Sequence, residues 1–165
     1  MIMKKHISII MGSKSDLPIM NQAVEIFKEF GVSYDINILS AHRTPHETIE
    51  FVENSDSSVF IAGAGGAAHL PGVVAGITIK PVIGVPINAS ISIQGIDSLL
   101  SIVQMPPGVP VATVGVDGAR NAGILAVQML AISDPDLANA LVSFKQAQKA
   151  KVLQHNQDVQ ATTRA

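Results

Sequence analysis

The feature that most constrains the fold of this chain is an alternation of short apolar runs with amphipathic segments. The runs that we predict to be strands are His6–Met11, Tyr34–Leu39, Ser57–Ala62, Lys80–Pro86 and Val109–Val116. Between them, apolar residues recur at the spacing of a helix that buries one face. This alternation is typical of a parallel sheet covered by helices on both faces. The sequence therefore predicts an α/β fold, a doubly wound, flavodoxin-like three-layer sandwich with five parallel strands in the order 2-1-3-4-5.

The helices are expected in the segments between these strands. They are predicted before Gly31, at Pro45–Asn54, through Val73–Ile77, around Ser98–Gln104 and at Asn121–Ile132. Asp134 and Pro135 open a long C-terminal helix that is expected to reach His155, followed by a polar tail over about residues 156–165. Because no linker or shift of composition divides the chain, residues 1–165 are expected to form a single domain.

Composition limits the classes of function. Hydrophobic residues make up 47% of the 165 residues and charged residues only 15%, which favours a sheet buried on both faces and contacts between subunits. The net charge of −2 and the aromatic content of 4% give no reason to expect nucleic acid or a membrane as partner. The chain has no cysteine, which excludes disulfides and thiol catalysis and fits a reducing compartment. We expect a cytoplasmic protein without a signal peptide or membrane span.

The stretch Ser40–Pro45 lies between a predicted strand and a predicted helix, and it carries the most chemistry. Helix-start amides favour an anion there. Arg43 adds a planar fork that suits phosphate or carboxylate, with the Ser40 hydroxyl beside it. His42 adds a group that exchanges a proton near neutral pH. These residue types predict an anion site next to an acid/base.

The same stretch also has a purely structural interpretation. Thr44 can cap the following helix, with Pro45 at the first position and Glu47 completing a capping box. In that case Ser40 also serves only as a cap and Arg43 makes a surface ion pair.

Two further loops carry polar or glycine-rich sequence. In Gly12–Asp16, Ser13 can hold a phosphate and Asp16 can bind ribose hydroxyls, although the turn is neither a P-loop nor a GxGxxG motif. In Gly63–Gly72, the residues Gly66 and Ala67 allow a planar ring to approach the backbone, and His69 follows them. Each loop alone is equally compatible with capping or packing. Because the first three strands are neighbours in the predicted order, all three loops converge, and we predict a pocket there.

A metal site is not predicted. His42 and His46 are four residues apart, but Pro45 and the turn between them argue against one shared helical face. The chain contains neither an HExxH motif nor an evident third ligand. A serine hydrolase is also disfavoured because the GxSxG elbow is absent.

Four stretches resemble the class I mutases of the PurE family, which act in purine biosynthesis. These stretches are Met11–Asp16, Ser40–Pro45, Ala62–Gly72 and Asp97–Pro106. The resemblance implies an enzyme that interconverts N5-carboxyaminoimidazole ribonucleotide and 4-carboxy-5-aminoimidazole ribonucleotide without metal, ATP or other cofactor in this step. It also implies a homo-octamer with active sites at subunit contacts.

The resemblance also implies roles for individual residues. Ser13 and Asp16 match residues that bind the ribonucleotide, Arg43 matches the phosphate-binding arginine with Ser40 beside it, and His42 matches the catalytic acid/base. We further expect Gly66, Ala67 and His69 to contact the substrate.

Two alternatives to the mutase stay open. One is a direct aminoimidazole ribonucleotide carboxylase, whose class has Lys-Gly-Pro where this chain has Arg43-Thr44-Pro45. The other is a non-catalytic flavodoxin-like module that binds a nucleotide or flavin. The connection Gly115–Ala122 departs from the family pattern, because Asp117 and Arg120 place charge where small residues are usual.

Overall fold

The computed structural model describes residues 6–163, and these residues contain one five-stranded parallel sheet in the order β2-β1-β3-β4-β5. The strands are β1 (His6–Met11), β2 (Ser33–Ile38), β3 (Val59–Gly65), β4 (Val82–Ile87) and β5 (Ala112–Thr113). In the register of the sheet, Ile9 of β1 lies between Ile36 of β2 and Ile61 of β3. The predicted fold and strand order are therefore confirmed.

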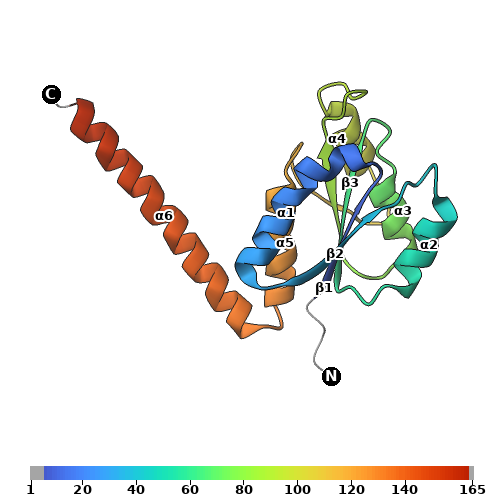
Figure 1. Ribbon diagram of the computed structural model, residues 1–165, viewed down its shortest axis with the longest axis horizontal. Coiled ribbons are helices and arrows are strands. Elements are labelled where there is room, and N and C mark those ends of the chain that lie inside the picture. Colours follow the sequence, from blue (N-terminus) through green and yellow to red (C-terminus); the bar gives the residue numbers. More distant parts are fainter. Residues whose placement is uncertain (1–5, 164–165) are drawn as a thin grey trace.

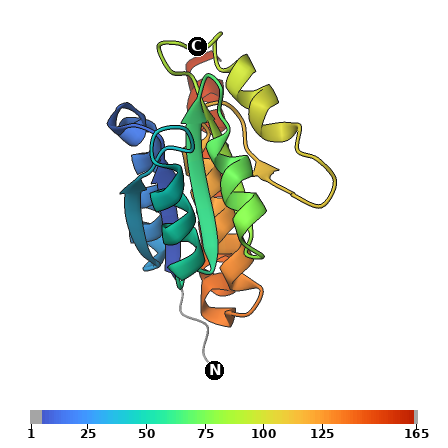
Figure 2. The same ribbon diagram turned by 90° about the vertical axis from the view of Figure 1, so that its right-hand side faces the viewer.

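Helices cover both faces of the sheet (Figure 1, Figure 2). One face is covered by α1 (Leu17–Phe30) and α5 (Ala119–Ala131), and the other by α2 (Pro45–Asn54), α3 (Leu70–Ile77) and α4 (Ile96–Val103). A short 3-10 helix, η1 (Lys14–Asp16), precedes α1.

Side chains that alternate along the strands divide the interior into two cores. Ile7 and Ile9 of β1 are fully buried against Phe27 of α1. Ile10 of the same strand points to the opposite face and packs in the cluster that contains Val74 of α3. A strand buried on both faces reads as a nearly continuous apolar run, which is why β1 could be recognised from sequence.

β2 and β4 differ from their predicted bounds by only one or two residues, whereas β3 and β5 differ by three residues at one end or more. β3 was expected to end at Ala62, but it continues to Gly65 because Gly63 and Gly65 pair with Val85 and Ile87 of β4. β5 was expected to span residues 109–116, but it contains only Ala112 and Thr113, which pair with β4. Pro110 lacks the backbone N–H that an earlier ladder bond would need.

The last helix, α6 (Pro135–Thr163), is longer than predicted. The Asp134 carboxylate accepts hydrogen bonds from the backbone of Asp136 and Leu137, as the capping prediction requires. The helix continues past His155 to Thr163, so a polar tail from residue 156 is wrong for 156–163, and residues 164–165 lie outside the described chain. Figure 1 shows α6 leaving the rest of the structure as an arm. None of the helices described between residues 6 and 163 is long and apolar enough to span a bilayer.

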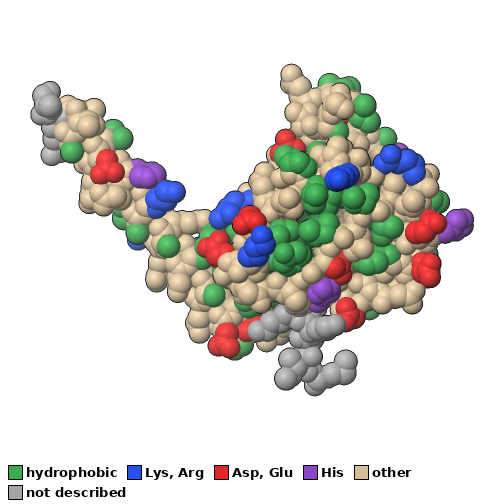
Figure 3. Space-filling view, viewed as in Figure 1, with side chains coloured by type: hydrophobic (Ala, Val, Ile, Leu, Met, Phe, Trp, Pro, Cys, Tyr) green, Lys and Arg blue, Asp and Glu red, His purple; other side chains and the backbone are tan. Residues whose placement is uncertain are grey.

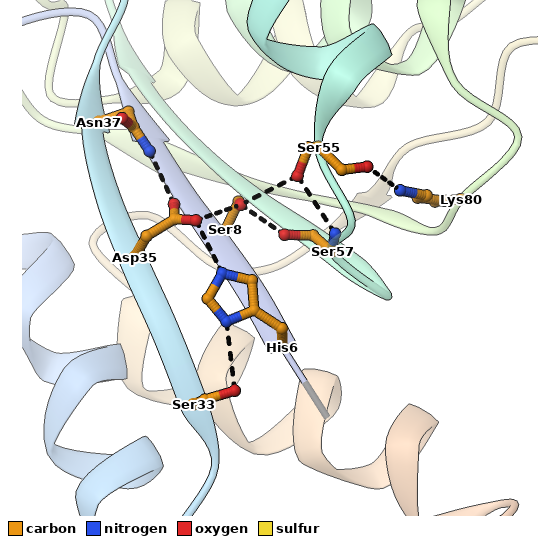
Figure 4. A network of polar contacts seen from close by, with 8 residues as sticks. All are labelled: His6, Ser8, Ser33, Asp35, Asn37, Ser55, Ser57 and Lys80. Atoms are coloured by element: carbon orange, nitrogen blue, oxygen red, sulfur yellow. Dashed lines mark hydrogen bonds and ion pairs between the residues drawn. The ribbon is translucent and has the colours of Figure 1, made fainter. Parts of the chain in front are cut away.

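A polar network interrupts the apolar packing near the amino end of β1 (Figure 4). The Ser8 hydroxyl is fully buried, donates to the Asp35 carboxylate over 3.0 Å and lies 2.5 Å from the Ser57 hydroxyl. His6 Nε2 is 2.7 Å from the same carboxylate. These partners explain how a serine is tolerated inside an otherwise apolar strand, because buried polar groups require hydrogen bonds.

Gly84 of β4 provides a test of the packing between the sheet and α4. A Cβ at Gly84 would lie 2.8 Å from Val111 Cγ1 and closer still to Ile102 of α4, whereas a Cβ at Gly76 of α3 would meet nothing within 4 Å. We expect Gly84→Ala to lower the free energy of unfolding by about 1–3 kcal/mol. Gly76→Ala is the matched control and should raise it by about 0.4–1 kcal/mol. Denaturant unfolding measures both, and equal shifts in the two variants would contradict the described packing.

Candidate active site

A cavity of about 390 Å³ opens at the carboxyl edge of the sheet. The loops after β1, β2 and β3 meet there, as expected for neighbouring parallel strands. A fourth loop, which follows β4, was not assigned to the site from sequence. The lining residues are Gly12, Ser13, Ser15, Asp16, Ser40, Ala41, His42, Arg43, Ala64, Gly65, Ala67, His69, Leu70, Ala89, Ser90 and Ile91.

The turn after β1 presents hydroxyls and one buried carboxylate. Ser13 caps η1, since its Oγ accepts bonds from the Ser15 amide over 3.3 Å and from the Ser15 hydroxyl over 2.9 Å. Asp16 is only 5% exposed. Burial raises the pKa of Asp16, and hydrogen bonds from Ser15 and from the Ser13 backbone oppose that rise, as does the charge of Arg43. The carboxylate therefore reaches the cavity from a desolvated position, where a hydrogen bond to a ligand hydroxyl is electrostatically strengthened.

The turn after β2 is closed by Thr44 in a way that the predicted capping box did not anticipate. Thr44 makes no side-chain capping bond to α2. Its Oγ1 instead accepts from the Ser40 amide over 2.8 Å and donates to the Ser40 carbonyl over 3.2 Å. The capping-box prediction for Thr44 is therefore wrong, because its hydroxyl is used to close the turn that carries Ala41, His42 and Arg43.

Arg43 connects this turn to the turn after β1. Its guanidinium donates to the Gly12 carbonyl, and its Nε donates to Ser40 Oγ over 3.4 Å. The Ser40 hydroxyl also accepts the Arg43 amide over 3.3 Å. Arg43 is exposed, and it stands at the amino end of α2, where the helix dipole already favours an anion.

His42 and His69 form a hydrogen-bonded pair, which could not be recognised from the sequence because the two residues are far apart in it. His42 Nε2 lies 2.8 Å from His69 Nδ1, and the rings meet edge to face at 85°. One nitrogen donates and the other accepts, so the pair holds a single bridging proton. Both side chains are exposed at the cavity. An imidazole that is held in this way can deliver or remove a proton at a bound ligand.

The glycine-rich segment at the end of β3, which begins at Gly65, forms another wall of the cavity that we call the glycine wall. Gly65 and Ala67 line the cavity. Gly66 between them, which was also predicted to contact the substrate, is buried, has a φ of 65° and does not line the cavity. A Cβ at Gly65 would stand 2.6 Å from the Ala89 Cβ. The wall therefore requires a residue without a side chain at Gly65, where the β4 loop packs closely.

The loop after β4 was missed although a signal for it existed. β4 is the neighbour of β3, so its carboxyl end had to reach the same edge. Asp117, for which the sequence offered no role, holds the beginning of this loop: its carboxylate accepts the Asn88 amide over 2.9 Å, and its own amide donates to the Pro86 carbonyl. The guanidinium of Arg120 lies 3.8 Å from the carboxylate of Glu29 on α1, outside the cavity.

Metal ligands do not gather at the cavity. Across residues 6–163, no group of three or more histidine, aspartate or glutamate residues could hold a metal ion. His46 is exposed on α2 and does not line the cavity. The arrangement offers an anion site, a desolvated carboxylate and an imidazole pair around a space that would admit a small planar ligand.

Comparison with known proteins identifies the family. Residues 6–151 match the AIR carboxylase family. The chain is 55% identical to the N5-carboxyaminoimidazole ribonucleotide mutase of Thermotoga maritima over 155 residues, covering 92% of this chain and 90% of that protein.

A second mutase of the same name, from Methanocaldococcus jannaschii, is 54% identical and covers 93% of this chain and 96% of its own length. The crystal structure of Treponema denticola PurE superposes with a TM-score of 0.82 at 28% identity, covering 93% of this chain and 97% of that one. The resemblance found in the sequence motifs is thus confirmed, and the chain belongs to the AIR carboxylase family.

Proposed function

We propose that this chain is a mutase that interconverts N5-carboxyaminoimidazole ribonucleotide and 4-carboxy-5-aminoimidazole ribonucleotide in the purine pathway. The observation that carries the proposal is the pairing of His42 with His69, directly beside Arg43 at the amino end of α2. This places a proton carrier next to an anion site, as a reaction on a phosphorylated heterocycle requires. The names of the two relatives support the same activity.

In the proposed binding mode, the ribonucleotide extends across the cavity. Arg43 and Ser40 bind the phosphate at the helix start, because a guanidinium and helix-start amides both favour an anion. Ser13 and Asp16 bind the ribose, with the buried Asp16 carboxylate accepting hydroxyl protons. The imidazole ring then lies against the backbone of Gly65 and Ala67, with His69 at its edge.

In the proposed chemistry, the substrate loses carbon dioxide from its exocyclic nitrogen and regains it at ring carbon 4. His42 gives a proton to the nitrogen as the N–C bond breaks. The nucleophilic ring carbon attacks the retained carbon dioxide, and His42 removes the proton from that carbon, which restores the ring. Proton and carboxyl group are therefore both conserved, and no cofactor is required. The glycine wall and Ala67 contribute a surface of low polarity that holds carbon dioxide away from water.

Conversion of N5-carboxyaminoimidazole ribonucleotide without ATP or bicarbonate tests the activity. The wild type should turn over under these conditions. His42→Asn should lose nearly all turnover, because general acid–base catalysis contributes about 10²–10⁴-fold, and it should still bind the ribonucleotide in calorimetry. His69→Asn is the matched comparison and should be milder.

The outcomes separate the three candidate functions. Turnover of His42→Asn near the wild-type rate would contradict the acid/base role of His42. Product formed only from aminoimidazole ribonucleotide and bicarbonate would identify a direct carboxylase instead. Binding of the ribonucleotide without conversion in either assay would identify a non-catalytic module.

We propose further that the chain acts in the cytoplasm as a homo-octamer of single-domain subunits with active sites at their contacts. Apolar side chains lie uncovered on the described surface, and Figure 3 shows some of them gathered over α1 and β2. On edge strand β2, Ile38 is 51% exposed. On α4, Ile96, Leu100 and Val103 are half exposed at helical spacing. An apolar stripe of this kind is typical of a surface that another subunit covers.

The arm α6 supports association as well. Only its first part is packed, through buried Leu137 and Leu141 and a ring contact between Phe144 and Phe30. Beyond it, Val152, Leu153 and Val159 are exposed. Most helical stability in proteins comes from packing of an apolar face, so a second subunit is expected to cover this part.

Light scattering coupled to size exclusion tests the assembly. We expect an octamer at micromolar concentration, and we expect Leu100→Asp to shift it toward smaller species because a charge would be buried in the contact. A wild type that stays monomeric and fully active would contradict the proposed assembly.

A further inference from the structure

Ser98, on the first turn of α4, joins two walls of the cavity without lining it. Its side chain is fully buried. Its hydroxyl donates to the Ile87 carbonyl at the end of β4 over 2.9 Å and accepts the Gly66 amide over 2.8 Å. One serine hydroxyl supplies one proton and two lone pairs, so this single side chain satisfies a buried carbonyl and a buried amide at once. It thereby fixes the distance between the glycine wall and the β4 strand end.

Asp97, the preceding residue, fixes the loop after β4. Its Oδ1 accepts the Ser92 hydroxyl over 2.5 Å, the Ile93 amide over 3.1 Å and the Ser98 amide over 2.9 Å. The Ser92 oxygen in turn accepts the Gly95 amide over 2.9 Å and lies 3.2 Å from the Ser98 hydroxyl. The bond from Ser92 is the main reason that the pKa of Asp97 lies below its usual value. Asp97 and Ser98 thus form one connected clamp.

The two segments held by the clamp line the cavity. Gly65 and Ala67 flank the clamped Gly66, and Ala89–Ile91 precede the clamped Ser92. Contacts between the two segments are close, since a Cβ at Gly66 would lie 3.0 Å from Ile91 Cδ1. The hydrogen bonds of Asp97 and Ser98 do not reach the Ser13 and Ser40 turns, so the clamp acts on one side of the cavity only.

We propose that Ser98 and Asp97 are positioning residues for the reaction: they hold the glycine wall and the β4 loop at the spacing that presses the reacting ring toward His42. This inference rests on the proposed function. The anion site at Arg43 is independent of the clamp, so substrate binding through the phosphate survives when the clamp is broken. The ring then samples positions in which proton transfer is slower, and a displacement of about 1 Å can cost about 10²-fold in rate.

The decisive variant is Ser98→Ala, which removes the shared hydroxyl. We expect kcat to fall by about 10- to 100-fold, with KM changed by less than about three-fold because the phosphate anchor is intact. Ser98→Thr keeps the hydroxyl and should recover most of kcat. Ser101→Ala is the matched control on the same helix, because the Ser101 hydroxyl bonds only the Asp97 carbonyl within α4, over 2.8 Å, and it should leave kcat at the wild-type value.

Asp97→Asn provides an independent variant at a partly exposed position, where folding is less at risk than at buried Ser98. It keeps the shape of the side chain but weakens three charge-assisted bonds, and it should lower kcat without an equal rise in KM. A loss of activity that only follows the fraction of folded protein, measured by thermal unfolding, would overturn the positioning role. So would a kcat of Ser98→Ala equal to that of Ser101→Ala, or a wild-type kcat in Asp97→Asn when Ser98→Ala does not fold.

Failure of this inference is distinguishable from failure of the proposed function. If the wild type does not convert the ribonucleotide, the proposed function fails and the positioning role falls with it. If the wild type and Ser101→Ala convert it and Ser98→Ala does so equally well, only the clamp is overturned.

Discussion

Parallel pairing of β1 with both β2 and β3 is the constraint on which the rest of the structure depends. It brings the carboxyl ends of three successive strands to one edge of the sheet, although their loops are separated by many residues in the sequence. Arg43 can therefore donate to the Gly12 carbonyl, and His42 can meet His69. Neither contact would exist in an antiparallel arrangement, where consecutive turns lie at opposite edges.

Small residues make this edge concave. β3 runs into a stretch of glycine and alanine, and the loop after β4 packs closely against it only because Gly65 lacks a side chain. The Ser98 hydroxyl then holds that stretch through the Gly66 amide, and Asp97 holds the loop after β4 through Ser92 and Ile93. In the proposed mechanism, polar groups at the β1 and β2 turns bind the ligand, while the backbone at the β3 and β4 loops shapes the space in which the ring reacts.

Much of the fold was predictable because the strongest signals are local. β1 and α2 have the predicted bounds, since an apolar run buried on both faces and a Pro-initiated amphipathic helix are each defined by their own residues. The end of β3 was not predictable in this way. Glycine weakens strands by propensity, and only its pairing with β4 keeps Gly65 in the sheet. The length of α6 was also misjudged, because its polar second half is exposed and meets no packing partner among residues 6–163 that would mark an end.

The candidate site was predictable in its polar residues and not in its connections. All predicted site residues except Gly66 line the cavity, because strand order alone brings their loops together. The His42–His69 pair and the role of Asp117 depend on tertiary distances that no spacing in the sequence encodes. The bond of Thr44 to Ser40 is local, but it competes with the equally local capping bond that was predicted. The loop after β4 could have been included, since the same argument of strand order applies to it.

The central claim is that the three strand-end turns form one ribonucleotide site anchored by its phosphate at Arg43. A calorimetric double cycle tests it most directly, with 4-carboxy-5-aminoimidazole ribonucleotide and the corresponding nucleoside each titrated into the wild type and into Arg43→Ala. The account predicts a coupling free energy between the phosphate and Arg43 of about 1.5–3 kcal/mol, the range for hydrogen bonds to charged groups. A coupling free energy near zero would contradict it and would leave the Gly12–Asp16 turn as the phosphate site.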